Sequence, residues 1–178
     1  MKEIQLSKGY LSQVDDSDYE RCMVGPKWFA KVTSNTVYAQ RHFRGVDGTR
    51  KTQKLHRFIL GITDPAVRID HRSGNGLDNQ RRNLRVSTPA QNSHNSRLNA
   101  GNTSGYKGVT WDATRNKWQA RLGVSGQRST VGRFTDPEDA ARAYDAAALK
   151  YHGPFAKTNA MLGLLPSLES SAALAQAA

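Results

Sequence analysis

A run of small and polar residues interrupts the chain at residues 98–105. Apart from Leu98 it contains only Asn, Ala, Gly, Thr and Ser, a composition typical of a flexible linker. A chain of 178 residues that is interrupted there is expected to build two small cores, one on each side. We therefore expect an α+β region at 1–54, a compact module at 55–99, a linker at 100–105, a second module at 106–160 and a disordered tail at 161–178.

The positive charge is concentrated in the middle of the chain. The formal net charge is +11, with +8 from residues 41–100 and +5 from residues 101–135, while the two ends are neutral or acidic. A surface of this kind attracts polyanions. Its concentration in one block favours a nucleic acid partner over an ordinary solvated surface, although charge alone does not separate DNA from RNA.

The sequence also excludes several classes of protein. Cys22 is the single cysteine, so neither an internal disulfide framework nor a zinc knuckle of cysteine pairs can form, and no structural zinc is expected. No apolar run approaches the roughly 18 residues of a membrane span, and the N-terminus lacks the apolar core of a signal peptide. We expect a cytoplasmic protein with no membrane partner and no small-molecule cofactor.

The first sixty residues predict short, mixed elements. Alternating and β-branched residues favour strands at 9–14, 28–32 and 36–43. Asp15 is a candidate N-cap for a short helix at 19–24, and Gly61 is expected to end a second helix at 55–60.

Asp70 and His71 are adjacent at the end of a short apolar stretch. A carboxylate there can hold Mg²⁺, and an imidazole of near-neutral pKa can take a proton from water. An Asp-His pair alone is common, but a second strand is expected at 83–86, after a loop rich in turn residues. Within that loop we interpret Asn75 and Asn79 as turn formers, whereas Asn83 is interpreted as functional.

A helix is expected to begin directly after the second strand. Thr88 and Gln91 have the spacing of a capping box, and Pro89 suits the first helical position. This start places Asn92 in the first turn. A strand, loop, strand and helix therefore bring together polar side chains that are costly to bury without a metal or a hydrogen-bond partner.

These residues resemble the HNH endonuclease family, with its ββα-metal fold, and in particular the phage and intron-encoded homing endonucleases. The resemblance covers about forty residues. His71, Asn83 and Asn92 match the family pattern, with Asn in the last position as in the homing branch. The matching segments are Leu55-His56-Arg57-Phe58-Ile59, Ile69-Asp70-His71, Gly74-Asn75, residues 77–85, and Gln91-Asn92 with His94-Asn95.

The resemblance implies a role for each matched residue. Asp70 and Asn92 would ligate one divalent metal, Mg²⁺ or Mn²⁺. His71 would be the general base that activates water, and Asn83 would hold the His71 loop through a backbone contact. His56 is interpreted as structural or phosphate-contacting. The candidates for phosphate contacts are Arg57, Arg72, Arg81, Arg82 and Arg85.

The second module predicts three strands and a helix. Strands are expected at 106–111, 117–124 and 128–134, and a helix from Pro137. In the middle strand one face carries Trp118, Ala120 and Leu122, and the other carries Lys117, Gln119 and Arg121. A helix covering the apolar face would leave a cationic sheet face exposed, and a small sheet of this kind can enter a major groove.

This module resembles the plant ethylene-response-factor (Apetala-type) DNA-binding domain. The resemblance implies that Lys107, Gly108, Lys117, Arg121 and Arg128 lie on the DNA-contacting sheet. Thr110 and Thr130 depart from the plant pattern, so the plant target sequence does not carry over. The matching segments are residues 104–109, 117–120, 131–134 and 138–145, and a closing stretch at 153–159.

The two resemblances together predict an α+β protein, a ββα-metal module followed by a three-stranded antiparallel sheet packed on one helix. We expect a metal-dependent endonuclease that cuts or nicks double-stranded DNA in a bacterial or phage-infected cell, as a monomer or weak dimer. Two alternatives stay open: a catalytically inactive DNA-binding regulator on an HNH scaffold, and a protein that binds or cuts RNA.

Overall fold

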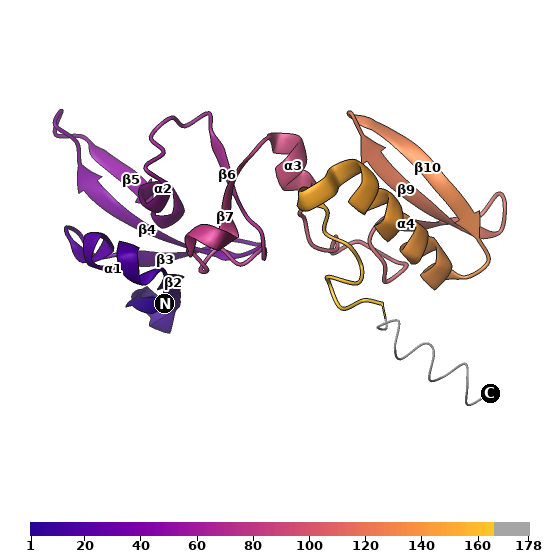
Figure 1. Cartoon of the computed structure of the whole chain (residues 1–178), viewed down its shortest axis with the longest axis horizontal. Helices are drawn as coiled ribbons and strands as arrows, with labels where there is room; N and C mark the ends of the chain where they lie inside the picture. The colour runs from indigo at the N-terminus through magenta and orange to yellow at the C-terminus, as the bar shows by residue number, and fades with distance from the viewer. Residues whose placement is uncertain (166–178) are drawn as a thin grey trace. The chain divides into compact units, whose positions relative to one another are not determined.

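The computed structural model describes residues 1–165 and consists of two compact units (Figure 1). The first unit is Met1–Asn92 and the second begins at Ser93. Both are built from small antiparallel sheets and short helices, so the α+β class is confirmed. The small, polar segment at 98–105 lies within the second unit. No helix of residues 1–165 has the length and apolar character needed to cross a membrane.

The first unit contains three antiparallel sheets. The first is β1 (Lys2–Gln5) with β2 (Leu11–Val14), followed by α1 (Asp16–Met23). The second sheet joins β3 (Phe29–Val32), β4 (Val37–Arg44) and β5 (Arg50–Lys54), and α2 (Leu55–Leu60) follows it directly. The third pairs β6 (Arg68–His71) with β7 (Leu84–Ser87), and α3 (Pro89–His94) begins two residues later.

The core of the first unit is packed around a buried arginine. The guanidinium of Arg41 lies 4.3 Å from the ring centre of Trp28 and 4.5 Å from that of Phe58, and it donates to the carbonyl of Val24 at 2.7 Å. These contacts join β4, the segment before β3, and α2. The buried apolar residues around them are Ile4, Leu6, Val14, Cys22, Trp28, Ala30, Ala39, Leu55, Ile59 and Leu84.

Most of the expected elements of the first unit are present, with one correction. Gly61 ends α2 in the left-handed conformation, as predicted. Asp15 precedes α1 but makes no side-chain capping bond. Its carboxylate instead accepts the backbone N–H of Arg81 at 2.8 Å, so Asp15 joins the start of α1 to a segment more than sixty residues away.

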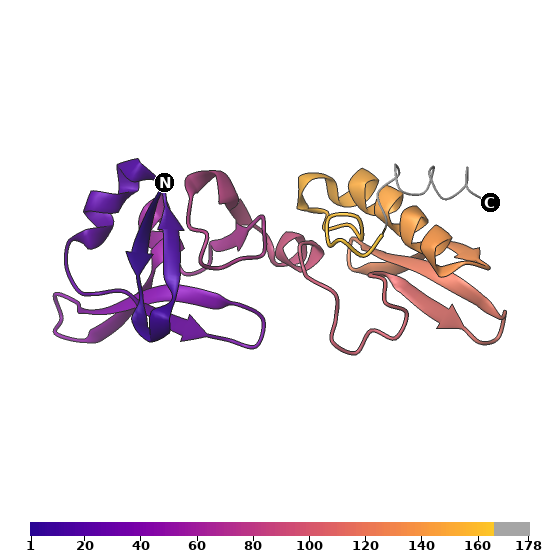
Figure 2. The ribbon, with the colours of Figure 1, turned by 90° about the horizontal axis from the view of Figure 1, so that it is seen from below.

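The second unit confirms the predicted sheet with one helix. The strands β8 (Val109–Asp112), β9 (Lys117–Val124) and β10 (Gln127–Phe134) form an antiparallel sheet with β9 in the centre. The helix α4 (Pro137–His152) lies along one face of it (Figure 2). Asp136 caps α4 by accepting the N–H groups of Glu138 and Asp139.

The second core matches the alternation expected for the central strand. Ala120 and Leu122 are buried against α4, with Ala140, Tyr144 and Ala148 on the helix side. Leu165 also belongs to this core, although it falls within the stretch expected to be a tail. The remainder of that stretch, 166–178, lies outside the described residues.

Candidate functional site

The pairing of β6 with β7 sets the surroundings of Asp70. In this register Asp70 lies opposite Arg85, and both side chains are buried. One carboxylate oxygen, Oδ2, is 2.6 Å from Nη2 and 2.8 Å from Nε of Arg85. A buried charge with a close partner of opposite sign is satisfied inside the protein. Arg85, predicted to be a phosphate contact, therefore holds the predicted metal ligand.

His71 follows Asp70 and is buried among aromatic rings. Its ring centre is 5.0 Å from that of His56 and 5.8 Å from that of Tyr38, and its Nε2 is 3.3 Å from Oδ1 of Asn79. Burial is the main cause that lowers the pKa of His71, so the imidazole is neutral at physiological pH. A neutral imidazole can accept a proton.

Asn79 is the residue of this site whose role the sequence did not reveal. We interpreted it as a turn former, but it is 1% exposed, and its amide nitrogen donates to Ser12 Oγ at 2.8 Å and to the carbonyl of Gly76 at 3.3 Å. Its oxygen is therefore the atom that faces His71. The one signal in the sequence was its place in the family motif, beside Leu77 and Asp78.

Asn83 bridges the loop that follows His71. Its Oδ1 accepts the N–H of Ser73 at 2.9 Å, and its Nδ2 donates to the carbonyl of Asp78 at 2.7 Å. The backbone oxygen of Asn83 also accepts the N–H of Arg72 at 2.9 Å. Because one side chain ties both ends of the loop, residues 72–78 are held against the end of β6.

His56 on α2 is a buried partner of His71. It is 6% exposed, and burial, followed by the charge of His71, lowers its pKa to about 3. Of its two predicted roles the structure favours the structural one, because its ring packs edge-on against the rings of Tyr38 and His71.

The remaining predicted residues of the first unit divide into exposed and internally bound groups. Arg72 and Arg82 are exposed. Arg81 is bound internally, with Nε and Nη2 at 2.7 and 2.9 Å from the carboxylate of the buried Asp18. This contact is also the largest cause that lowers the pKa of Asp18. A further arginine, Arg57, donates to the carbonyls of Asp64 and Val67.

Asn92 is exposed on α3. The predicted capping box is confirmed at the start of this helix: the N–H of Thr88 donates to Gln91 Oε1 at 2.9 Å, and the N–H of Gln91 donates to Thr88 Oγ1 at 3.2 Å. The backbone N–H of Asn92 then donates to the carbonyl of Thr88. The local geometry thus fixes the backbone of Asn92 but leaves its side chain on the surface.

In the second unit, three predicted DNA-contact residues share the face of the sheet opposite α4. Lys117 and Arg121 alternate with the buried residues of β9, and Arg128 pairs with Gly123 on the same side. Gln119 donates to Thr130 Oγ1 at 2.8 Å on this face. The three cations are exposed.

Arg133 belongs to the same face and was missed in the sequence. A register shift between Thr130 and Gly132 moves the following residues by one position, so Arg133 pairs with Gln119. Its Nε is 3.0 Å from a carboxylate oxygen of Asp112. Gly132 was the available signal, since glycine inside a strand often marks a bulge.

Lys107 and Gly108 precede the sheet and have other contacts. Nζ of Lys107 donates to the carbonyls of His94 and Ser96 at 2.8 and 2.7 Å, and burial is the main cause that lowers its pKa to about 8. A Cβ on Gly108 would lie 2.0 Å from the Tyr144 ring. These contacts give both residues a role in stabilising the unit, and the carbonyl of Gly108 accepts the N–H of Arg121 at 2.8 Å.

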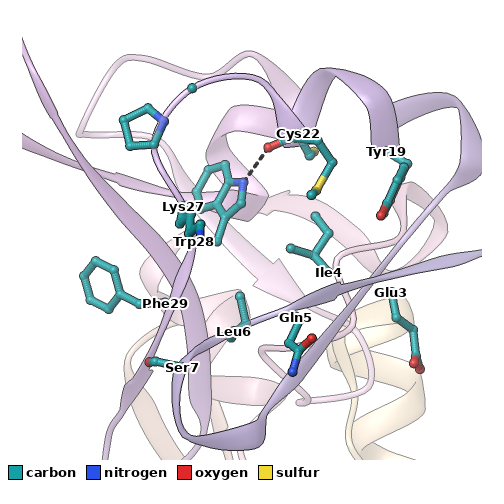
Figure 3. Close-up of a pocket in the computed structure, with 13 residues that line it drawn as sticks. Glu3, Ile4, Gln5, Leu6, Ser7, Tyr19, Cys22, Lys27, Trp28 and Phe29 are labelled. Carbon is teal, nitrogen blue, oxygen red and sulfur yellow. Dashed lines mark hydrogen bonds between the residues drawn. The ribbon is translucent and has the colours of Figure 1, made fainter.

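A hollow of about 860 Å³ lies elsewhere in the first unit (Figure 3). It is lined by β1, α1 and the segment at 25–29, where Trp28 Nε1 donates to the carbonyl of Cys22 at 2.7 Å. None of the predicted site residues lines it.

Known proteins match both parts of the chain. An AP2 domain is recognised at residues 104–154. An AP2-like ethylene-responsive transcription factor of Oryza sativa subsp. japonica is 48% identical over 56 residues, which cover 30% of this chain and 9% of the rice protein. An uncharacterised HNH endonuclease of Acanthamoeba polyphaga mimivirus is 32% identical over 111 residues, which cover 60% of this chain and 57% of the viral protein.

These matches define a protein with an HNH-type part and an AP2-type domain, and they confirm both resemblances. An AP2 domain indicates DNA binding. Protein 3.8 of Escherichia phage T7 is 33% identical over 89 residues, which cover 50% of this chain and 73% of the phage protein. The chain belongs to the family of this phage protein.

Proposed function

We propose that this protein is a metal-dependent endonuclease that hydrolyses phosphodiester bonds in double-stranded DNA. The observation that carries the proposal is the buried, neutral His71, which follows Asp70 at the end of β6 and precedes a loop that Asn83 ties down. A buried imidazole of lowered pKa is a group that active sites use for proton transfer. The name of the mimivirus relative supports the same class of activity.

His71 would act as the general base. Because Asn79 Oδ1 accepts from Nε2 of His71, the lone pair lies on Nδ1, which would take a proton from water. The resulting hydroxide would form a bond to phosphorus as the bond to the 3′-oxygen breaks. The products would be a 5′-phosphate and a 3′-hydroxyl, with a proton reaching the leaving oxygen from solvent.

The donor types of Asp70 and Asn92 suit a hard divalent metal. Asp70 and Asn92 would hold Mg²⁺ or Mn²⁺ through a carboxylate and an amide oxygen, which are the donors that these ions prefer. Residues 1–165 contain no cluster of three His, Cys, Asp or Glu side chains, so water and phosphate oxygens would complete the coordination. When bound, the ion would neutralise negative charge that develops on the phosphate.

The AP2 unit would supply affinity for DNA and would fix the position of the protein along the duplex. The exposed cations on its outer sheet face, Lys117, Arg121 and Arg128, are suited to DNA phosphates and to base edges in a major groove. Phosphate contacts of this kind position a duplex without reading its sequence, and base contacts would set the target.

A second candidate is a DNA-binding regulator without nuclease activity. The ion pair between Asp70 and Arg85 favours it, because the carboxylate already has a positively charged partner.

Cleavage of a supercoiled plasmid separates the two functions. The plasmid should carry DNA from the genomic neighbourhood of the gene, and wild type is compared with His71→Ala in Mg²⁺ and in EDTA. We expect Mg²⁺-dependent relaxation that His71→Ala loses while its DNA affinity is kept. Open-circle product would indicate nicking and linear product a paired cut. Tight, salt-sensitive binding without any cleavage would instead favour the regulator.

A further inference from the structure

We propose that the outer face of the β3–β4–β5 sheet is a second DNA-binding surface, separate from the AP2 unit, that holds the phosphates of the duplex next to His71. This inference rests on the proposed function, because it concerns how the same DNA reaches the candidate active site.

The pairing register shows which side chains share this outer face. Ala39 and Arg41 of β4 are buried on the inner side, so the alternate residues of the strand face outward. Residues that lie opposite one another in an antiparallel pair point to the same face. On the outer face Lys31 therefore lies beside Tyr38, and Lys54 lies beside Gln40. Arg50 lies beside Arg44 on the same face.

The outer face carries four exposed cations and no carboxylate. The three strands contain no Asp or Glu, and Lys31, Arg44, Arg50 and Lys54 are all exposed. A hollow of about 420 Å³ beside them is lined by Pro26, His42, Phe43, Arg44 and Arg50. Cations without neighbouring acids on one small sheet repel one another, and a polyanion relieves this repulsion.

Tyr38 connects the face to the candidate active site. Nζ of Lys54 lies 5.7 Å from the centre of the Tyr38 ring. The same ring is 5.8 Å from the rings of His56 and His71. A phosphate backbone that follows Lys54 would therefore pass close to His71. The partner we infer is double-stranded DNA, the substrate of the proposed function.

The test compares two full-length variants that lose the same charge. The face variant is Lys31→Gln/Arg44→Gln/Arg50→Gln/Lys54→Gln. The matched control is Lys2→Gln/Lys8→Gln/Lys27→Gln/Lys51→Gln, which removes four exposed cations of the first unit from other positions. Affinity for a labelled duplex of mixed sequence is measured in EDTA over a series of salt concentrations.

We expect the salt slope of the face variant to fall by about 0.9 for each phosphate that the face no longer neutralises, up to about 3.6, and the control to keep the wild-type slope. If the two variants change the slope equally, only net charge matters and the inference is wrong, whereas DNA binding by the AP2 unit still stands. A wild-type protein that binds no duplex, or that binds RNA in preference, would overturn the proposed function and this inference together. If the quadruple variant does not fold, the double variant Lys31→Gln/Arg50→Gln is measured in its place. The same comparison of salt slopes then applies, with an expected decrease of up to about 1.8.

Discussion

At the scale of single residues, the ion pair between Asp70 and Arg85 would oppose the proposed binding of a metal by the Asp70 carboxylate. Arg85 holds Oδ2 of Asp70, and a divalent cation would compete with its positive charge for this carboxylate. We expect Arg85→Met to bind Mn²⁺ roughly tenfold more tightly than wild type in the absence of DNA. It should also be less stable in EDTA, by about 3–5 kcal/mol, because a buried carboxylate is left unpaired.

The measurement is thermal unfolding with increasing Mn²⁺, which reports binding without any cleavage. Arg85→Lys is the matched control, because it keeps the positive charge. Equal Mn²⁺ affinities of Arg85→Met and wild type would mean that Arg85 does not compete for Asp70.

His56 makes the stability of the first unit depend on pH. Its pKa is about 3 in the folded chain and 6.5 as the ordinary value, so below about pH 6.5 the unfolded chain binds more protons. The contribution of a neutral His56 to stability is complete at higher pH and decreases as the pH falls from 6.5 toward 3. At about pH 5 the loss is about 2 kcal/mol, to which the lowered pKa of His71 adds in the same direction.

We expect His56→Phe to be less sensitive to this pH change, because a phenyl ring can pack against Tyr38 and His71 but does not titrate. Urea unfolding of wild type and variant at about pH 7 and about pH 5 tests this. The same decrease in unfolding free energy for both proteins would exclude His56 as the cause.

At the scale of the elements, a structural feature could be predicted from the sequence when it was caused by residues that are neighbours in the chain. The capping box at Thr88 and the alternation in β9 follow from neighbouring residues, and both were found. The strand β5 was not expected, because its sequence, RKTQK, has no apolar residue and its pairing with β4 alone defines it. The contact of Asp70 with Arg85 likewise depends on a strand register that spans fifteen residues.

Lys107, in the stretch before β8, tests whether a lysine bound inside the unit contributes to stability and not to DNA binding. Lys107 donates to two carbonyls of the second unit, and charged hydrogen bonds of this type contribute about 1.5–3 kcal/mol each. Because the bond to Ser96 is exposed and contributes little, we expect Lys107→Met to lower the unfolding free energy by about 1.5–3 kcal/mol and to leave the salt slope of DNA binding unchanged.

Arg121→Met on the outer sheet face is the comparison, and the opposite result is expected for it: unchanged stability and a slope reduced by about 0.9. A reduced slope for Lys107→Met in a fully folded protein would return Lys107 to the DNA-contacting residues.

At the scale of the whole molecule, two cationic sheet faces on one chain predict cooperation through effective concentration. Once the AP2 unit has bound a duplex, the candidate nuclease unit meets the same DNA at high local concentration, even if its own affinity is weak. Lys117→Ala/Arg121→Ala/Arg128→Ala should therefore reduce the salt slope by up to about 2.7 and abolish selective cleavage at low protein concentration. In the proposed mechanism the chemistry would depend on Asp70 and His71, so Mg²⁺-dependent cleavage should return without site preference when the protein concentration is raised. A plasmid assay over a range of protein concentrations, with sequencing of the cut ends, tests both statements. Cleavage that keeps its site preference in this triple variant would mean that the first unit selects the target by itself.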